Sequence, residues 1–517
     1  MPTTQPSAHT IRTSALTWAI WTLLIAALYY PTYQIFPYYD DVAHVEGAAH
    51  YGTSIIREDP VPMFRPFERI INGLSWQNPV RPWWHAQPNP FWFAKTSSLL
   101  FLLLKVGLVG YLARTVLPER DRLLRLAVPL LYLFHPMHVA AVIKIDTISE
   151  NLAALVALCV VSLLARLAML PRESCTSRLL SFYVFAAAML TLVGMLSKEA
   201  YFGMAAATPL LIAIAVAGVP RRKLAFTFAS SALLTALLAA LYFGLRRLEG
   251  YQLGGYKAGR YHLTFGINVL INSAASIGAS LFPGNTMKIF AGFDFFYVLL
   301  AVGLILAILL LYWRSYFAFI AQACTGRILA IPNGRILLLA LLATFASLLP
   351  GCMVSELISE NQTESTIPFV ILLVVGIPAV SSVASRWQKR PQFAFLPIAL
   401  VFTAATLMAN ATTEKVAAAH RLSDRAYHWG DVLVEQATHK PVPHFFLCIA
   451  PVTPALVQPK YSIFSVPDST LAATQLYRLH MANYPGAIDF IPVPGPVDQH
   501  ICSMTFADQQ LYPGVPH

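Results

Sequence analysis

The sequence predicts a mainly α-helical protein that crosses a membrane many times. Of its 517 residues, 57% are hydrophobic and only 12% are charged, whereas a soluble domain carries about a quarter charged residues. The apolar residues are gathered in long runs, and lysines and arginines cluster in the short gaps between them. Such clusters orient membrane helices, so the net charge of +11 does not indicate a nucleic-acid partner.

About eleven runs are long enough to span a bilayer, which takes about 20 apolar residues. They lie at 14–36, 92–114, 126–145, 150–170, 179–197, 201–219, 224–245, 294–313, 335–355, 366–385 and 391–411. Basic clusters fall in alternate gaps, and the basic gaps are the cytoplasmic ones. We therefore expect a cytoplasmic N-terminus, a non-cytoplasmic C-terminus and one membrane-embedded bundle over 1–411. Its two long outer loops are 37–91 and 246–293.

The remaining segment, 412–517, has a different pattern. Short β-prone stretches at 444–450, 461–466 and 488–493 are typical of strands. The stretch 469–484 has helical spacing. We expect a small α/β domain outside the membrane.

Charged residues gather on the predicted outer face. Asp40 and Asp41 follow the first apolar run directly, and Lys198 and Glu199 form a short turn between two later runs. An acidic pair beside lipid is costly unless it is used or water reaches it. A solvated loop is the alternative reading of the doublet. The convergence of several such segments on one face favours a functional site there.

Four stretches resemble, in order, motifs of the multi-spanning glycosyltransferases that use lipid-linked sugar donors, the GT-C fold. The closest resemblance is to the transmembrane O-mannosyltransferases that carry TPR tails, and to their bacterial relatives. The matching elements are Tyr39-Asp40-Asp41 for YDD, Phe64-Arg65-Pro66-Phe67 for YRPL, His135-Pro136-Met137-His138 with Val142 and Glu150 for HPxH…V…E, and Ser197-Lys198-Glu199 for KE. The TPR tail is absent from this sequence.

The resemblance implies an inverting transferase in a membrane, of the bacterial inner-membrane kind. It would move a sugar of hexosyl or mannosyl type from a polyprenyl-phosphate donor to a hydroxyl on a glycan, lipid or protein, outside the cytoplasm. Its partners would be that donor, the acceptor and membrane lipids, with no nucleic acid and no cofactor. A flippase or transporter of lipid-linked glycans is one alternative, although no internal repeat is evident. A surface-polysaccharide polymerase or ligase is another.

Transfer to a hydroxyl needs a base beside the acceptor, because the hydroxyl loses its proton as it attacks. Asp40 or Asp41 is the candidate base, and the resemblance slightly prefers Asp40. The other carboxylate would orient a hydroxyl of the donor or acceptor.

The leaving phosphate needs cations. Four are candidates for binding it, namely Lys198, Arg65, Lys144 and Arg260. Each has a structural alternative. Lys198 can instead pair with Glu199 and Arg65 with Glu68, while the other two can anchor the chain at the membrane interface.

Four further residues are candidates for shaping the site, namely His135, His138, Glu150 and Glu199. On one continuous helix the two histidines would share a face, because they are three residues apart. A divalent metal held there is possible but not favoured over hydrogen bonding. The O-mannosyltransferase resemblance itself implies transfer without a metal.

The topology gives a first prediction. Single cysteines introduced into 37–91 and into 412–517 should both react with a membrane-impermeant thiol reagent added outside intact cells, because both segments are expected on the non-cytoplasmic side. A cysteine introduced between Arg166 and Arg178 is the control and should stay unlabelled. Labelling of only one of the two outer segments would contradict the expected number of spans.

Overall fold

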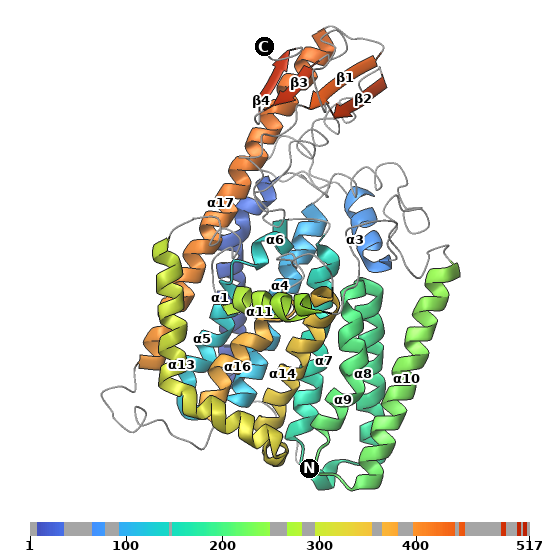
Figure 1. Ribbon diagram of the computed structural model, residues 1–517, viewed down its shortest axis with the longest axis vertical. Helices are drawn as coiled ribbons and strands as arrows, with labels where there is room; N and C mark the ends of the chain where they lie inside the picture. The colour runs from blue at the N-terminus through green and yellow to red at the C-terminus, as the bar shows by residue number, and fades with distance from the viewer. Residues whose placement is uncertain are drawn as a thin grey trace.

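The computed structural model describes residues 8–35, 65–77, 92–143, 147–248, 266–281, 295–353, 364–380, 396–439, 444–449, 487–492, 504–507 and 510–513. These residues form a helical bundle with a small sheet at one end (Figure 1). Most helices run roughly parallel to the long axis of the molecule, and α11 lies across them. The expectation of a mainly helical protein is therefore confirmed for the described residues.

Each of the eleven expected apolar runs contains a helix or part of one. The helices are α1 (Ala8–Tyr29), α3 (Pro66–Gln77), α4 (Trp92–Val116), α5 (Arg122–Leu133), α6 (His138–Ile143), α7 (Ile148–Met169), α8 (Ser177–Ser197), α9 (Phe202–Ala215), α10 (Arg221–Leu248), α11 (Ile267–Leu281), α13 (Phe295–Cys324), α14 (Pro332–Cys352), α16 (Ile367–Val380) and α17 (Leu396–His439). Short 3₁₀ turns join some of them, namely η1 (Tyr30–Gln34), η3 (Glu119–Asp121), η4 (Arg172–Ser174), η5 (Glu199–Tyr201) and η6 (Arg327–Ala330).

Five helices in the described residues are long and apolar enough to cross a membrane, and they are α4, α7, α8, α10 and α14. Shorter apolar helices occur at Phe202–Ala215, Ile267–Gly278 and Ile367–Ala379. The structure thus supports an integral membrane protein, and the number of crossings stays a prediction.

One expected span, 126–145, is divided into two helices. Helix α5 ends at Leu133, and α6 begins only at His138. Pro136 lies between them, and a proline disfavours helical backbone at the residue before it. The spacing of His135 and His138 predicted a shared face on one continuous helix. Because the helix is interrupted between them, they do not share one.

The C-terminal strands form one sheet. Its strands are β1 (His444–Ile449), β2 (Ala487–Pro492), β3 (Met504–Ala507) and β4 (Gln510–Pro513), in the order β2-β1-β3-β4. β1 is parallel to both β2 and β3, and β3 and β4 are antiparallel. The strands β1 and β2 lie where the sequence indicates strands, whereas 461–466 and 469–484 lie outside the described residues. The boundary expected after residue 411 falls inside α17, which continues without a break to His439.

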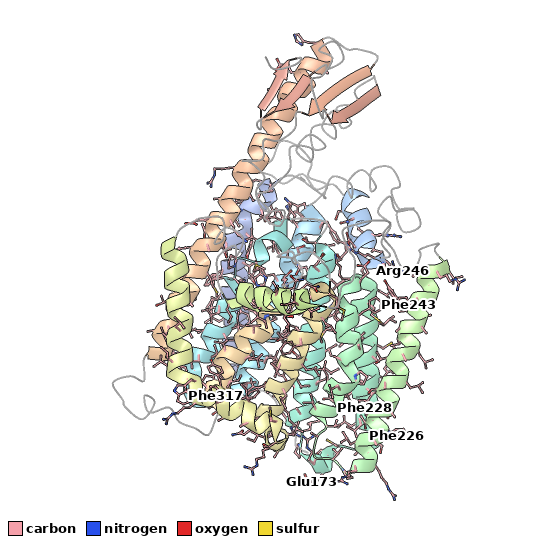
Figure 2. All side chains as sticks on the ribbon, in the orientation of Figure 1. Glu173, Phe226, Phe228, Phe243, Arg246 and Phe317 are labelled. Atoms are coloured by element: carbon pink, nitrogen blue, oxygen red, sulfur yellow. The ribbon has the colours of Figure 1, made fainter. Side chains whose placement is uncertain are left out.

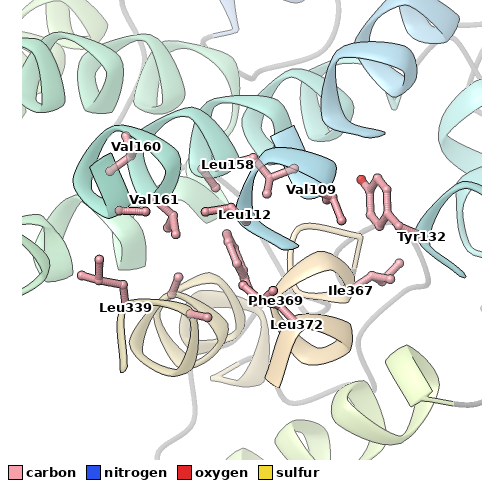
Figure 3. Packing of buried hydrophobic residues seen from close by; sticks show 14 of the residues in the cluster. Val109, Leu112, Tyr132, Leu158, Val160, Val161, Leu339, Ile367, Phe369 and Leu372 are labelled. Atoms are coloured by element: carbon pink, nitrogen blue, oxygen red, sulfur yellow. The ribbon is translucent and has the colours of Figure 1, made fainter. Parts of the chain in front are cut away.

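The core of the bundle is built around α7, which has the largest buried share of the candidate membrane spans. The buried cluster there includes Leu158 of α7, Val109 and Leu112 of α4, Leu339 of α14 and Phe369 of α16 (Figure 3). In contrast α10 has the smallest buried share, and many of its large apolar side chains are exposed, Phe226 and Phe228 among them (Figure 2). An apolar helix surface of this kind is suited to contact with lipid.

Buried cations secure helix ends inside the bundle. Arg335 of α14 donates from Nη1 to the carbonyl of Ala217 and from Nη2 to that of Ala168, each at 2.7 Å. Lys95 of α4 donates to the carbonyls of Thr32 and Ile35, which follow α1. The last carbonyls of a helix have no partner within it, and cations are favoured at that end. These contacts therefore give backbone carbonyls the hydrogen bonds that lipid could not provide.

Close packing of α9 on α14 gives a second prediction. A Cβ atom on Gly203 would lie 2.0 Å from the backbone oxygen of Ala346, so Gly203→Ala must push the two helices apart. We expect it to cost about 1–3 kcal/mol of stability, as overpacking usually does. Gly244 of α10 is the control, because a Cβ atom added there would have no neighbour within 4 Å. Gly244→Ala should leave the thermal midpoint of the detergent-solubilised protein unchanged or raised. Equal midpoints for the two variants would contradict this packing.

Candidate functional site

The structure brings together four of the residues that the sequence singles out. Arg65, Glu150, Lys198 and Glu199 meet where the start of α3, the start of α7 and the end of α8 come close. This is the end of the bundle from which α17 leads to the sheet (Figure 1). Glu68 joins them, and we call these five residues the outer ion cluster. The other candidates, Asp40, Asp41, Lys144 and Arg260, lie outside the described residues.

Arg65 is the centre of the outer ion cluster. Its Nε and Nη2 each lie 3.2 Å from Oε2 of Glu199, and its Nη1 lies 3.4 Å from Oε2 of Glu68. Arg65 directly precedes α3, and Glu68 follows one turn later. A fork of nitrogens on one guanidinium can hold two carboxylates in fixed directions. Arg65 thus ties α3 to the turn that begins at Glu199.

Lys198 forms the second half of the outer ion cluster, in an ion pair with Glu150. Ser149 donates to the other oxygen of Glu150 at 2.7 Å. Glu150 lies in the first turn of α7, where the helix dipole favours a carboxylate. Lys198 caps the end of α8 in an extended conformation, which directs its side chain away from that of its neighbour Glu199. Lys198 therefore pairs with Glu150 and not with Glu199, the partner that adjacency in the sequence suggested.

These contacts keep Arg65 and Glu199 charged. Burial works to lower the pKa of the Arg65 guanidinium, but the charges of Glu199 and Glu68 outweigh it, so the pKa lies above its ordinary value. Burial works to raise the pKa of the Glu199 carboxyl, but the charges of Arg65 and Lys198 hold it below its ordinary value. Glu199 is therefore ionised at neutral pH. The cluster can present two fixed cations, each partly neutralised by the carboxylates that position it.

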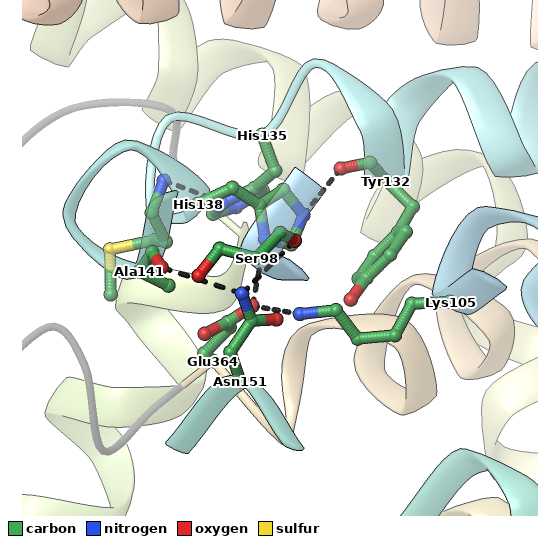
Figure 4. Close-up of polar contacts among 9 residues, drawn as sticks. Ser98, Lys105, Tyr132, His135, His138, Ala141, Asn151 and Glu364 are labelled. Atoms are coloured by element: carbon green, nitrogen blue, oxygen red, sulfur yellow. Dashed lines mark hydrogen bonds and ion pairs between the residues drawn. The ribbon is translucent and has the colours of Figure 1, made fainter. Parts of the chain in front are cut away.

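The two histidines belong to a second group deeper in the bundle. His138 places Nδ1 3.3 Å from Oε1 of Glu364 and Nε2 2.7 Å from the carbonyl of Tyr132 (Figure 4). Lys105 of α4 forms an ion pair with the same Glu364 oxygen. Lys105, His138 and Glu364 are almost wholly buried, and we call them the inner triad.

The hydrogen bonds of His138 in the inner triad require two protons, one on Nε2 and one between Nδ1 and Glu364. The carbonyl of Tyr132 can only accept, so Nε2 of His138 carries a hydrogen. The contact between Nδ1 and Glu364 then needs a second proton, either on the ring or on the carboxyl group.

Asn151 lies next to Glu150 on α7 and donates to the carbonyls of Ser98 at 3.2 Å and Ala141 at 3.4 Å. The first turn of α7 therefore carries one side chain of the outer ion cluster and one that braces α4 and α6.

His135 has a local structural role. Its Nδ1 accepts a hydrogen bond of 3.3 Å from the backbone of Met137, in the turn that separates α5 from α6. The ring centroids of His135 and His138 are 6.2 Å apart. In the described residues no group of three or more His, Cys, Asp and Glu side chains could hold a metal ion.

Sequence reasoning missed Lys105 and Glu364. A signal for Lys105 was present, because a lysine in the middle of an apolar run is a candidate for a functional or paired charge. Glu364 stands just before the expected run at 366–385, where a charged residue does not differ from an ordinary residue at the end of a span. Nothing local indicated that these two residues, 259 positions apart, would pair.

The inner triad gives a third prediction. Lys105→Met leaves Glu364 without its full counter-charge in a buried position, and breaking a buried pair in this way typically costs about 3–5 kcal/mol. Lys105→Met together with Glu364→Gln removes both charges and should recover much of that loss. Thermal unfolding of the two variants and of Glu364→Gln in the same detergent tests the coupling. Strictly additive losses would show that the pair is not energetically coupled.

Comparison with known proteins shows likeness at the level of structure. No family model and no curated protein sequence matches the chain. The crystal structure of ArnT from Cupriavidus metallidurans bound to undecaprenyl phosphate is 13% identical, with a TM-score of 0.56 over 97% of this chain and 98% of that one. The apo structure of the same protein is 13% identical, with a TM-score of 0.53 over 93% of this chain and 87% of that one. The chain therefore has a fold like that of ArnT, in agreement with the fold expected from the motif resemblance.

Proposed function

We propose that the chain is an integral membrane glycosyltransferase that takes a sugar from a polyprenyl-phosphate donor and passes it, with inversion, to a hydroxyl outside the cytoplasm. The observation that carries this proposal is the likeness over almost the whole chain to ArnT, whose structure holds undecaprenyl phosphate. The sequence motifs support the same class independently of that likeness. The acceptor is a glycan, lipid or protein hydroxyl, and the sugar is of hexosyl or mannosyl type.

The reaction needs a base. We propose Asp40 or Asp41 as the group that takes the proton from the acceptor hydroxyl. The acceptor oxygen then bonds to the anomeric carbon while the bond from that carbon to the phosphate oxygen breaks. Polyprenyl phosphate leaves with the electron pair of that bond. A positioned base contributes about 10²- to 10⁴-fold to such a step.

The reaction also needs positive charge beside the leaving phosphate. Lys198 and Arg65 are proposed to face it, with Lys144 and Arg260 as further cations from the neighbouring segments. Supporting this role, Lys198 and Arg65 sit in one cluster whose three carboxylates restrict their positions. Glu150 and Glu199 thus act as positioning residues.

The inner triad supports the frame around that site. His138 is held from two sides, and its partners come from α5 and from the segment before α16. His135 holds the adjoining turn. We propose that both histidines shape the site by fixing α6 and the start of α7, without binding a metal or cofactor. The expected setting is a bacterial inner membrane, with the N-terminus cytoplasmic and the C-terminus periplasmic.

The fourth prediction concerns the base. Asp→Asn at the correct position keeps the shape of the side chain but removes the proton acceptor. We expect Asp40→Asn or Asp41→Asn to lower the transfer rate by about 10²-fold or more while leaving donor binding intact. Lys198→Ala should instead weaken donor binding and slow transfer. The assay uses purified protein in nanodiscs with a polyprenyl-phosphate sugar, and it measures binding and transfer separately.

Glu173→Gln is the matched control, because Glu173 lies at the opposite end of the bundle (Figure 2). It should transfer sugar at the wild-type rate. Full activity in both Asn variants would remove the acidic doublet from the mechanism. Donor and acceptor are supplied on the same side, so a flippase or transporter would give no product in this assay. Products bearing many added sugar units would instead point to the polymerase alternative.

A further inference from the structure

Arg246 is a buried cation that neither the sequence motifs nor the proposed function uses. It stands in the last turn of α10, the helix with the smallest buried share among the candidate spans. Even so, only 8% of the residue is exposed. Its neighbour Arg247 has the same charge and lies on the same helix end, but is exposed. Of these two adjacent arginines, Arg246 is therefore buried and Arg247 is exposed.

Arg246 lies beside the outer ion cluster. Tyr242, one turn earlier on α10, has a buried hydroxyl on which the charges of Glu199, Arg246 and Arg65 all act. Figure 2 places Arg246 at the upper end of α10, on the side of the molecule that bears α3 and the end of α8. Helix α10 packs on α8, and α3 packs on α8 as well. The guanidinium thus reaches the same end of the bundle as Arg65 and Lys198.

Arg246 differs from those two cations in its partners. Arg65 is bound by Glu68 and Glu199, and Lys198 by Glu150. Among the described residues no carboxylate forms an ion pair with Arg246, and its buried Nε has no hydrogen-bond partner. Tyr242 offers the guanidinium a hydrogen bond but no charge. A buried guanidinium with no opposite charge among the described residues calls for an anionic partner.

Aromatic side chains lie next to Arg246 at this end of α10. Phe202 stacks on Phe243 with ring centroids 5.2 Å apart, and it meets Tyr242 edge to face at 5.1 Å. Phe243 is 37% exposed, and the α10 surface continues with exposed Leu241 and Leu245. An apolar chain lying on this surface would keep its polar end at the level of Arg246.

We infer that Arg246 is a principal ligand of the donor's lipid phosphate, and that the prenyl chain runs from it over the Phe202–Phe243 pair along the outer face of α10. This rests on the proposed function and adds to it the residue and the helix by which the lipid enters. A planar guanidinium can bind two phosphate oxygens at once, which a lysine cannot. Arg65 and Lys198 already hold carboxylates, so Arg246 adds to these two cations a guanidinium that pairs with no carboxylate of the described residues.

The test measures binding of undecaprenyl phosphate to the purified full-length protein in nanodiscs. Arg246→Gln removes the charge but keeps a side chain that can donate hydrogen bonds, and Arg246→Lys keeps the charge but loses the fork. Both should weaken binding, by about tenfold or more for the Gln variant, as expected for the loss of a charged hydrogen bond. Arg247→Gln is the matched control and should bind within about twofold of wild type. Undecaprenol, which lacks the phosphate, should bind the wild type and Arg246→Gln equally.

The outcomes separate the inference from the proposed function. Wild-type affinity in both Arg246 variants would overturn the inference and leave the transferase proposal standing. Equal weakening by Arg246→Gln and Arg247→Gln would overturn it too, since it would show a general surface charge effect. Failure of the wild type itself to bind undecaprenyl phosphate would count against the proposed function. Size-exclusion profiles of each variant establish that folded protein is being compared. If Arg246→Gln does not fold, the affinity of Arg246→Lys provides the test.

Discussion

The ion pair between Lys105 and Glu364 is the contact on which the middle of the bundle depends. A single charge among apolar helices is expensive, and the cost falls only when an opposite charge and hydrogen bonds surround it. Glu364 meets both Lys105 and His138, so one carboxylate joins α4, α6 and the segment that leads into α16. Those elements cannot separate without leaving a charge in apolar surroundings. The pair therefore selects one arrangement of helices whose apolar surfaces could otherwise pack in several ways.

The same rule governs the end of the bundle that carries the candidate site. Arg65 and Lys198 are fixed by three carboxylates from α3, α7 and the turn after α8. Their direction is thus set before any ligand arrives, which is what electrostatic catalysis requires. The consecutive residues Glu150 and Asn151 connect this end to the deeper helices, because one belongs to the outer ion cluster and the other braces α4 and α6.

Sequence patterns predicted the helices well, because long apolar runs have few other ways to satisfy their backbone in lipid. They also predicted that Arg65, Glu150, Lys198 and Glu199 lie on one face, and in the described residues these four side chains meet in a single cluster. They did not predict the partners. Lys198 and Glu199 are adjacent in sequence, yet they bind different residues, because Lys198 is the extended residue that ends α8. The pairing of Lys105 with Glu364 depends on how distant helices pack, and no local spacing encodes that.

The continuous helix α17 runs from the bundle to the C-terminal sheet (Figure 1). At about 1.5 Å per residue, its 44 residues measure roughly 66 Å, about twice the hydrocarbon thickness of a bilayer. Helix geometry therefore sets how far α17 extends beyond the bundle toward the sheet (Figure 1). Each residue added to or removed from α17 beyond the bundle would turn the end of the helix by about 100° relative to the bundle. The phase of α17 thus decides which side of the helix meets β4, the strand that it contacts.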